Sequence, residues 1–259
     1  MNSPGLPAFP DLPAFPGLLA LMLAPFVGSF LGVLVRRLPA GRSWAWSRSA
    51  CEHCGRVLPA AELVPLLSYV MLRGRCAGCA APIGWFHPAI ELAALAVASL
   101  VIAAAGTEPS SLWPGCVLGW GCLTLALIDW RHFRLPDAIT LPLLLLGLLA
   151  TGWRQPASLG DHALACLLGW LAFRGIALLY RRLRGIEGLG QGDAKLLAAA
   201  GAWLGTAALP VVVCVGAALT LLGVLGQAAW LRRAPGRHRR VAFGPGLAAA
   251  LFGCWLLLR

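Results

Sequence analysis

The sequence has little charge for its length. Only 12% of its 259 residues are Asp, Glu, Lys or Arg, whereas 59% are hydrophobic and the mean hydropathy is +0.78. Soluble domains carry about 25% charged residues, so a soluble fold is excluded. The apolar residues form long runs separated by short arginine-rich clusters, which is typical of a protein that crosses a membrane several times.

Acidic residues are scarcer still, with 10 against 21 basic residues and a formal net charge of +11. This excess does not indicate a nucleic-acid partner, because the basic residues sit in short loops beside apolar segments rather than in a stripe with interleaved aromatic residues. It instead indicates how the chain is oriented in a lipid bilayer.

The N-terminus lacks the basic segment of a cleavable signal peptide, and the first apolar run begins only near Gly17. We therefore expect this run to be a retained anchor. Before it, the segment LPAFP occurs twice, and so many prolines predict an extended tail without a helix over residues 1–16.

A spanning helix needs roughly 20 mostly apolar residues. By this standard the fold is all-α and polytopic, with about eight transmembrane helices expected near residues 17–35, 88–105, 112–129, 137–152, 161–180, 194–208, 209–231 and 244–258. Pro210 divides an apolar stretch that is too long for one crossing.

The positive-inside tendency predicts the orientation of these spans. Of the 21 Lys and Arg residues, 18 lie in four loops, at residues 36–87, 130–136, 181–195 and 232–243. We expect these loops to be cytoplasmic. Because the number of spans is even, both termini are then periplasmic.

Four of the nine cysteines form two closely spaced pairs, Cys51-x-x-Cys54 and Cys76-x-x-Cys79, in the loop at 36–87. Two such turns direct four thiolates at one point, the tetrahedral set that Zn²⁺ favours in structural sites. With about fifty residues, this small subdomain is expected to need the metal in order to fold. The alternative is two disulfides or idle thiols, and His53 is taken as a bystander. The other five cysteines lie in apolar runs and are interpreted as small buried residues.

Two aspartates stand at the same depth in the predicted bundle. Asp129 ends the third span in LTLALIDW, and Asp193 begins the sixth in GLGQGDAKLL. Carboxylates at membrane depth are costly and usually functional or paired. Gly190 and Gly192, with Gly188, are expected to free the backbone so that Asp193 can approach a facing helix and an extended substrate.

Two neighbouring carboxylates share one proton, so one can activate a water molecule while the other stabilises the oxyanion. This is the chemistry of an aspartic peptidase, and the proton belongs to the pair rather than to either residue. The alternative for Asp193 is a helix cap paired with Lys195.

Two further carboxylates have mixed interpretations. Asp137, in RLPDAIT, is favoured as the N-cap of the fourth span over a chemical role. Glu91 lies within the second span, where it either orients the site or the substrate or pairs with an arginine.

Several motifs together resemble the bacterial type 4 prepilin peptidase family, also called leader peptidase/N-methyltransferase, an aspartic peptidase family known as A24. The similarity covers nearly the whole chain. In order along the chain, the motifs are GSFLGVLVRRLP, CEHCG, ELVPLLSY, RCAGC, HPAIELAAL, LIDWRHFRLPDAITLPL, GIEGLGQGDAKLLAAAGAWLG and VAFGPGLAAA.

The resemblance implies that Asp129 and Asp193 are the catalytic pair. It also implies the substrate, since members remove the basic leader of type IV prepilins and type II secretion pseudopilins, cutting after a glycine and before a residue that is usually phenylalanine. They then methylate the new α-amine with S-adenosylmethionine. The expected location is the bacterial inner membrane, with the active site at its cytoplasmic face.

The resemblance also suggests a division of the chain. Residues 17–105 are assigned to the methyltransferase part and residues 106–259 to the transmembrane peptidase. Two departures concern methyl transfer: Gly32 replaces a common asparagine, and the stretch from Arg37 to Cys51 is shorter than in many members. No glycine-rich nucleoside fingerprint is visible, so the cofactor site is not assigned to residues.

Three rival functions are weighed. A proton-coupled transporter predicts carboxylates near the midplane and inverted repeats, and no convincing repeat is present. A zinc-loop scaffold for pilus or secretion assembly would not need both aspartates. Relatives of eukaryotic intramembrane aspartyl proteases lack the zinc loop and cut within transmembrane segments.

Overall fold

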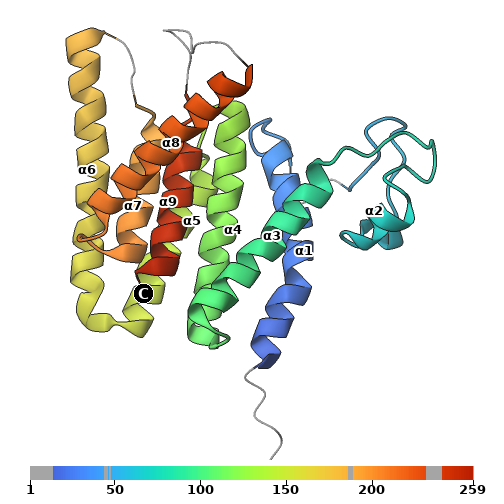
Figure 1. Cartoon of the computed structure of the whole chain (residues 1–259), viewed down its shortest axis with the longest axis horizontal. Coiled ribbons are helices and arrows are strands. Elements are labelled where there is room, and N and C mark those ends of the chain that lie inside the picture. Colours follow the sequence, from blue (N-terminus) through green and yellow to red (C-terminus); the bar gives the residue numbers. More distant parts are fainter. Residues whose placement is uncertain (1–13, 44–45, 47, 186–188, 232–240, 259) are drawn as a thin grey trace, which may run out of the picture.

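The computed structural model of the chain describes residues 14–43, 46, 48–185, 189–231 and 241–258, and this part is almost entirely helical (Figure 1). Eight of its helices have 14 or more residues: α1 (Ala14–Arg37), α3 (Phe86–Ala105), α4 (Pro109–His132), α5 (Asp137–Arg154), α6 (Leu159–Arg184), α7 (Gln191–Leu204), α8 (Leu209–Leu231) and α9 (Gly244–Leu257). Short helices η1 (Ala60–Leu63), α2 (Leu67–Met71) and η2 (Pro156–Ser158) lie in the connections.

The prediction of an all-α membrane protein is confirmed. Six of the helices, namely α1, α3, α4, α5, α6 and α8, are long and apolar enough to cross a membrane. The other two predicted spans are α7 and α9, which have only 14 residues each. At 1.5 Å per residue they extend about 21 Å, short of a hydrocarbon core of about 30 Å.

The N-terminal boundary differs from the prediction. Helix α1 begins at Ala14, so the last three residues expected in the proline-rich tail are helical, and residues 1–13 lie outside the described part. Pro16 falls in the first turn of the helix, where the missing backbone N–H has no partner to lose. The density of prolines therefore did not exclude a helix start at this point.

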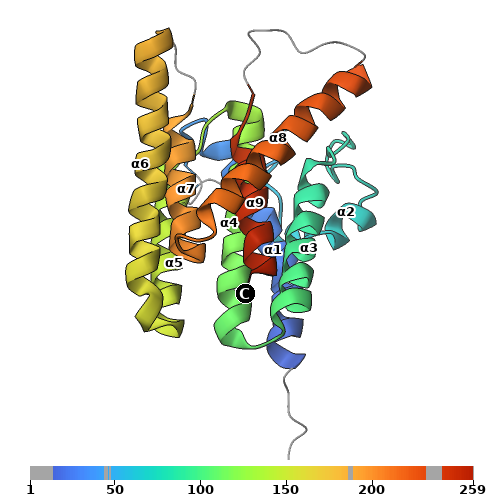
Figure 2. The same cartoon turned by 60° about the vertical axis from the view of Figure 1, so that its left-hand side comes forward.

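Successive long helices run in opposite directions through the bundle (Figure 1). The N-terminal end of α1 and the C-terminal end of α9 lie at one end, and the loop that carries α2 projects from the other (Figures 1 and 2). Below, the end of the bundle that carries this loop is called the loop side. The C-terminal end of α4 and the N-terminal end of α7 both lie there (Figure 1).

Packing divides the helices into inner and outer ones. Helix α4 contacts α1, α3, α5 and α9, whereas α7 contacts α5, α6, α8 and α9. In the apolar stretch of α4 that could cross a membrane, 61% of the residues are buried, compared with only 11% in the corresponding stretch of α8. Leucines on α8 such as Leu221 and Leu222 are exposed. Such outward apolar side chains are suited to contact with lipid.

Small residues let the helices approach closely. A Cβ atom added to Gly169 of α6 would lie 2.9 Å from the carbonyl oxygen of Leu197 in α7. In a bilayer the hydrophobic effect does not drive helices together. Close approach instead stabilises their packing through dispersion contacts. It holds α7, and with it Asp193, firmly against its neighbours.

Candidate functional site

Asp129 lies on the last turns of α4, at the loop side of the bundle. Its side chain is buried, and its Oδ2 atom accepts a hydrogen bond of 3.0 Å from the backbone N–H of Gly244, the first residue of α9. A Cβ atom on Gly244 would lie 2.7 Å from the same oxygen, so only glycine fits here without displacement. The contact joins residues 115 positions apart.

Asp193 occupies the third position of α7, also on the loop side. It is buried, and its Oδ2 atom accepts a hydrogen bond of 3.2 Å from the backbone N–H of Gly190. A carboxylate at this position reaches back to the N-cap amide and satisfies a donor that the helix leaves free. The side chain does therefore cap α7, as the alternative interpretation expected.

The fold brings the two predicted aspartates together. Gly192, next to Asp193, packs against Leu135 in the connection that follows α4, and no ion pair among the described residues includes either aspartate. In each side chain the amide contact uses Oδ2, and the Oδ1 atom accepts no hydrogen bond from a described residue. Both carboxylates are thus buried on the loop side, and each keeps one oxygen without a hydrogen-bond partner among the described residues.

Gly190 and Gly192 act through space rather than through backbone freedom. Gly190 has a φ of −68°, which any residue can adopt. However, a Cβ atom there would lie 2.9 Å from Asp193 Oδ2, and one on Gly192 would lie 2.7 Å from the Cβ atom of Leu135. Both positions therefore require the absence of a side chain. Gly188 lies outside the described residues.

One prediction nearby is wrong, and so is part of the alternative interpretation of Asp193. Lys195 pairs with Asp137 at 2.5 Å and not with Asp193. Asp137 is the first residue of α5 rather than its N-cap, which is Pro136, and no side chain caps the helix. In the first turn, Asp137 instead interacts favourably with the helix dipole and with Lys195.

Glu91 serves the loop that follows α1. Its Oε2 atom accepts a hydrogen bond of 2.8 Å from the backbone N–H of Leu66, a residue with a left-handed φ of 59°. The side chain is only 5% exposed. The contact attaches the loop to α3, and the predicted pairing with an arginine is not among the ion pairs of the described residues.

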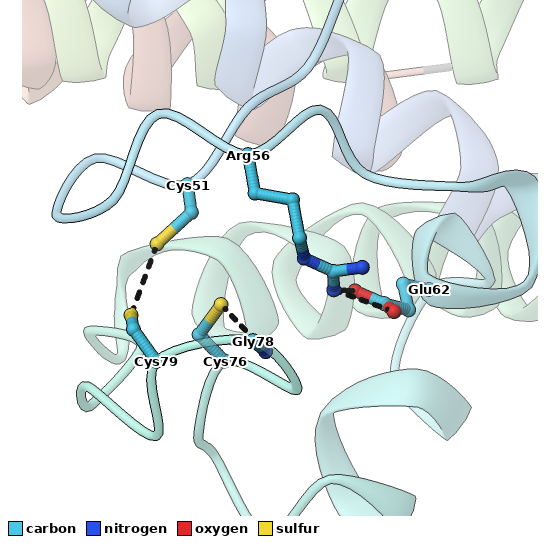
Figure 3. A network of polar contacts seen from close by, with 6 residues as sticks. All are labelled: Cys51, Arg56, Glu62, Cys76, Gly78 and Cys79. Atoms are coloured by element: carbon cyan, nitrogen blue, oxygen red, sulfur yellow. Dashed lines mark hydrogen bonds and ion pairs between the residues drawn. The ribbon is translucent and has the colours of Figure 1, made fainter.

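The four paired cysteines form one cluster. Their Sγ atoms all lie within 4.8 Å of one another. Figure 3 shows three of the four, and the Sγ atoms of Cys51 and Cys79 are 3.9 Å apart. Tetrahedral coordination with Zn–S bonds of about 2.3 Å places sulfurs about 3.8 Å apart. The donor set therefore fits a closed structural metal site, and the nine cysteines form no disulfide.

The two halves of the cluster have the same local structure. In the first half, the backbone N–H of Cys51 donates to the carbonyl of Arg56, and the carbonyl of Cys51 accepts from the N–H of Gly55. In the second half, Cys76 makes the same two backbone hydrogen bonds with Ala81 and Ala80. Each turn is closed by an isolated antiparallel bridge, Ala50 to Val57 in one half and Arg75 to Pro82 in the other. The same turn thus occurs twice, with equivalent residues 25 positions apart, and the two turns together form the site.

Backbone donors favour a thiolate at Cys76. Hydrogen bonds from the N–H groups of Cys79 and Gly78 lower the pKa of the Cys76 thiol to about 6. At Cys79 the amide of Ala81 acts in the same direction, but burial and the neighbouring thiols outweigh it and raise the pKa to about 11. Four thiols this close cannot all ionise without a cation between them.

Arg56 links the two halves. Its guanidinium donates hydrogen bonds to both carboxylate oxygens of Glu62, at 2.7 and 2.5 Å, and these bonds raise the pKa of Arg56 (Figure 3). It also interacts electrostatically with Cys76. The arginine therefore extends from one half of the cluster to the other, where it lies beside Gly78.

The sequence interpretation missed two parts of the site. Gly244 was quoted only as part of a motif, although its amide contacts Asp129. The ring of Phe86 was not considered, yet the guanidinium of Arg36 lies 4.9 Å from its centroid and that of Arg131 lies 4.1 Å from it. The spacing of Arg131, two residues after Asp129, could have drawn attention to this link.

Comparison with known proteins gives a consistent picture. The sequence profile of the bacterial peptidase A24 N-terminal domain matches residues 22–105, and that of the type IV leader peptidase family matches residues 116–225. No solved structure matches the chain.

Several curated relatives carry the same name, "Prepilin leader peptidase/N-methyltransferase". The protein of Burkholderia pseudomallei is 41% identical over 255 residues, which is 89% of this chain and 82% of that protein. Those of Aeromonas hydrophila and Pseudomonas aeruginosa are 36% and 35% identical, each over 90% of this chain and 87% of the relative. The resemblance stated from the motifs is thereby confirmed.

Proposed function

The chain belongs to the type IV leader peptidase family, and from this premise we propose that it removes the leader of prepilin-like precursors and methylates the new N-terminus. One observation carries the peptidase part. Two buried carboxylates, Asp129 and Asp193, lie at the ends of α4 and α7 on the loop side of the bundle, and neither has a cationic partner among the described residues.

The proposed mechanism uses the pair as one acid and one base. The ionised carboxylate takes a proton from a water molecule as the water oxygen attacks the scissile carbonyl. The protonated partner donates a hydrogen bond to the developing oxyanion and later passes a proton to the leaving amine. The amides of Gly244 and Gly190 hold Oδ2 of Asp129 and Asp193, which leaves both Oδ1 atoms to bind the water in the proposed mechanism.

The proposed substrates are type IV prepilins, type II secretion pseudopilins or both. Their leader is basic and lies before an apolar helix, and the cut falls between a glycine and, usually, a phenylalanine. With that helix in the bilayer, the scissile bond stands at the membrane surface, the depth proposed for the two aspartates. We assign the peptidase to residues 106–259 and the methyltransferase part to residues 17–105.

We further propose the bacterial inner membrane as the location, with the loop side in the cytoplasm and both termini in the periplasm. The positive-inside tendency supports this orientation, because 18 of the 21 basic residues lie in the four loops that the sequence predicts to be cytoplasmic. Cys51, Cys54, Cys76 and Cys79 would hold a structural Zn²⁺, and S-adenosylmethionine would supply the methyl group.

Replacement of each aspartate by asparagine tests the peptidase. In Asp129→Asn and Asp193→Asn, we expect leader cleavage to fall by about 10³-fold or more, because each change removes one member of the acid–base pair. Product masses from a purified precursor measure the cleavage, and methylation of an already cleaved pilin reports the fold independently.

Asp161→Asn is the matched control. Asp161 lies at the opposite end of the bundle, where it accepts hydrogen bonds from Thr206, and asparagine keeps an acceptor there. We expect this variant to cleave at the normal rate. Substantial cleavage by either of the first two variants would overturn the proposal.

A further inference from the structure

A cavity of about 580 Å³ lies between the loop-side ends of α1 and α3 and the loop that carries the four cysteines. Ser29, His87 and Tyr69 contribute to its lining from α1, α3 and α2, and neither Asp129 nor Asp193 does. Sites for small molecules typically enclose about 300–1,000 Å³. The cavity is therefore large enough for a cofactor and separate from the carboxyl pair.

Both signs of charge meet in this cavity. Its lining includes the arginines Arg36, Arg37, Arg42 and Arg48 and the glutamates Glu52, Glu62 and Glu91. A ligand that carries both a carboxylate and a cation would find partners for each, whereas a purely anionic ligand would meet three carboxylates.

Several of these charges are neutralised within the protein and others are not. Glu52 pairs with Arg36, and Glu62 pairs with Arg56. Glu91 is 5% exposed and accepts a hydrogen bond from Leu66, yet it forms no ion pair with a described residue. A buried carboxylate without a cation is costly, so a bound cation would stabilise it.

The cavity also offers positive charge to an anionic group of a ligand. Arg42 and Arg48 line the cavity, and neither forms an ion pair in the part of the chain that the structure describes. Guanidinium groups are well suited to bind a carboxylate through two parallel hydrogen bonds. Apolar side chains such as Leu58 and Leu72, with Tyr69, supply a surface for a planar base.

We propose that this cavity binds S-adenosylmethionine, an assignment that rests on the proposed methylation. The carboxylate of the cofactor would face Arg42 and Arg48, and its cationic ammonium and sulfonium part would face Glu91. When bound, the cofactor supplies a methyl group: the amine lone pair forms the N–C bond, the C–S electron pair remains on sulfur, and one amine proton passes to water.

The position of the cavity suits two consecutive reactions. Arg36 of its wall contacts the ring of Phe86, and Arg131, two residues after Asp129, contacts the same ring. The cavity therefore borders the end of α4, which carries Asp129. A pilin N-terminus released by cleavage would have a short path to the methyl donor.

Direct binding tests the assignment. We expect purified full-length protein to bind one equivalent of radiolabelled S-adenosylmethionine in equilibrium dialysis. In Glu91→Gln and Arg42→Gln, we expect the affinity to fall at least tenfold with an unchanged melting temperature, because the glutamine at position 91 still offers an acceptor to Leu66.

Glu108→Gln and Arg154→Gln are matched controls at the opposite end of the bundle, where both residues are exposed. We expect wild-type affinity from both. Wild-type affinity in Glu91→Gln and Arg42→Gln as well would overturn the assignment. So would wild-type protein that removes leaders but binds no cofactor, whereas binding without cleavage would overturn the peptidase proposal and leave the cavity assignment standing.

Discussion

The four-cysteine loop and the helix that carries Asp193 are held in place in contrasting ways. Between Leu38 and Trp85, the described residues include only two that are buried, Pro65 and Cys76. In α7, ten of 14 residues are buried. Close packing stabilises helices in a bilayer, so α7 is held by its neighbours, whereas the loop lies outside the bundle and has almost no core of its own.

The difference shows how each site is built. In the loop, a metal ion would offset the repulsion among the four thiolates, and its binding would then be part of the folding free energy. In the bundle, packed helices hold two carboxylates together and offset their repulsion through the rest of the structure. Each of the following experiments disturbs one side of this comparison.

Removal of the metal should have the largest effect. After chelation, or in Cys51→Ser, we expect amides between residues 48 and 85 to exchange hydrogen at the rate of an unfolded chain, while those of α4 and α7 keep their protection. Hydrogen exchange followed by mass spectrometry measures both. Cys214→Ser, at an exposed cysteine outside the cluster, should change neither region, and a protected loop in metal-free protein would contradict the prediction.

A methyl group at the start of α9 tests the packing of the carboxyl pair. Gly244→Ala places a Cβ atom 2.7 Å from Asp129 Oδ2, and we expect kcat for leader cleavage to fall about 10²-fold, as for a displaced reacting group. KM for the precursor should change little, and the pH profile of kcat should shift because the environment of the pair has changed.

The same helix offers a control for this substitution. A Cβ atom on Gly253 would meet no atom within 4 Å, so Gly253→Ala should leave kcat unchanged and strengthen the helix by up to about 1 kcal/mol. Equal kinetics in Gly244→Ala and Gly253→Ala would show that the contact of Gly244 with Asp129 does not position the carboxylate.

The smallest effect is expected within the loop, from its two equivalent turns. Gly55 has a φ of +70°, and its counterpart Ala80 has a φ of +57°, a conformation that costs a residue with a Cβ atom about 1 kcal/mol. Ala80→Gly should therefore tighten zinc binding about fivefold and Gly55→Ala should weaken it by a similar factor. Competition with a chelator measures both, and changes in the same direction would contradict the assigned equivalence.

Local patterns in the sequence were sufficient for the fold class and for one complete site. Apolar runs predict helices wherever they are long, and the spacing of Cys51, Cys54, Cys76 and Cys79 predicts their cluster, because both depend on residues near one another along the chain. Asp129 and Asp193 could also be singled out, since acidic residues are rare and these two end and begin apolar runs.

Contacts between distant segments could not be read in this way. The amide that holds Asp129 comes from Gly244, the partner of Lys195 is Asp137, and Glu91 receives its hydrogen bond from Leu66 in another element. The cavity beside the loop likewise needs α1, α3 and the loop together. Such contacts depend on how helices pack and in what register, and packing is set by the shapes of whole surfaces rather than by the residues next to each group.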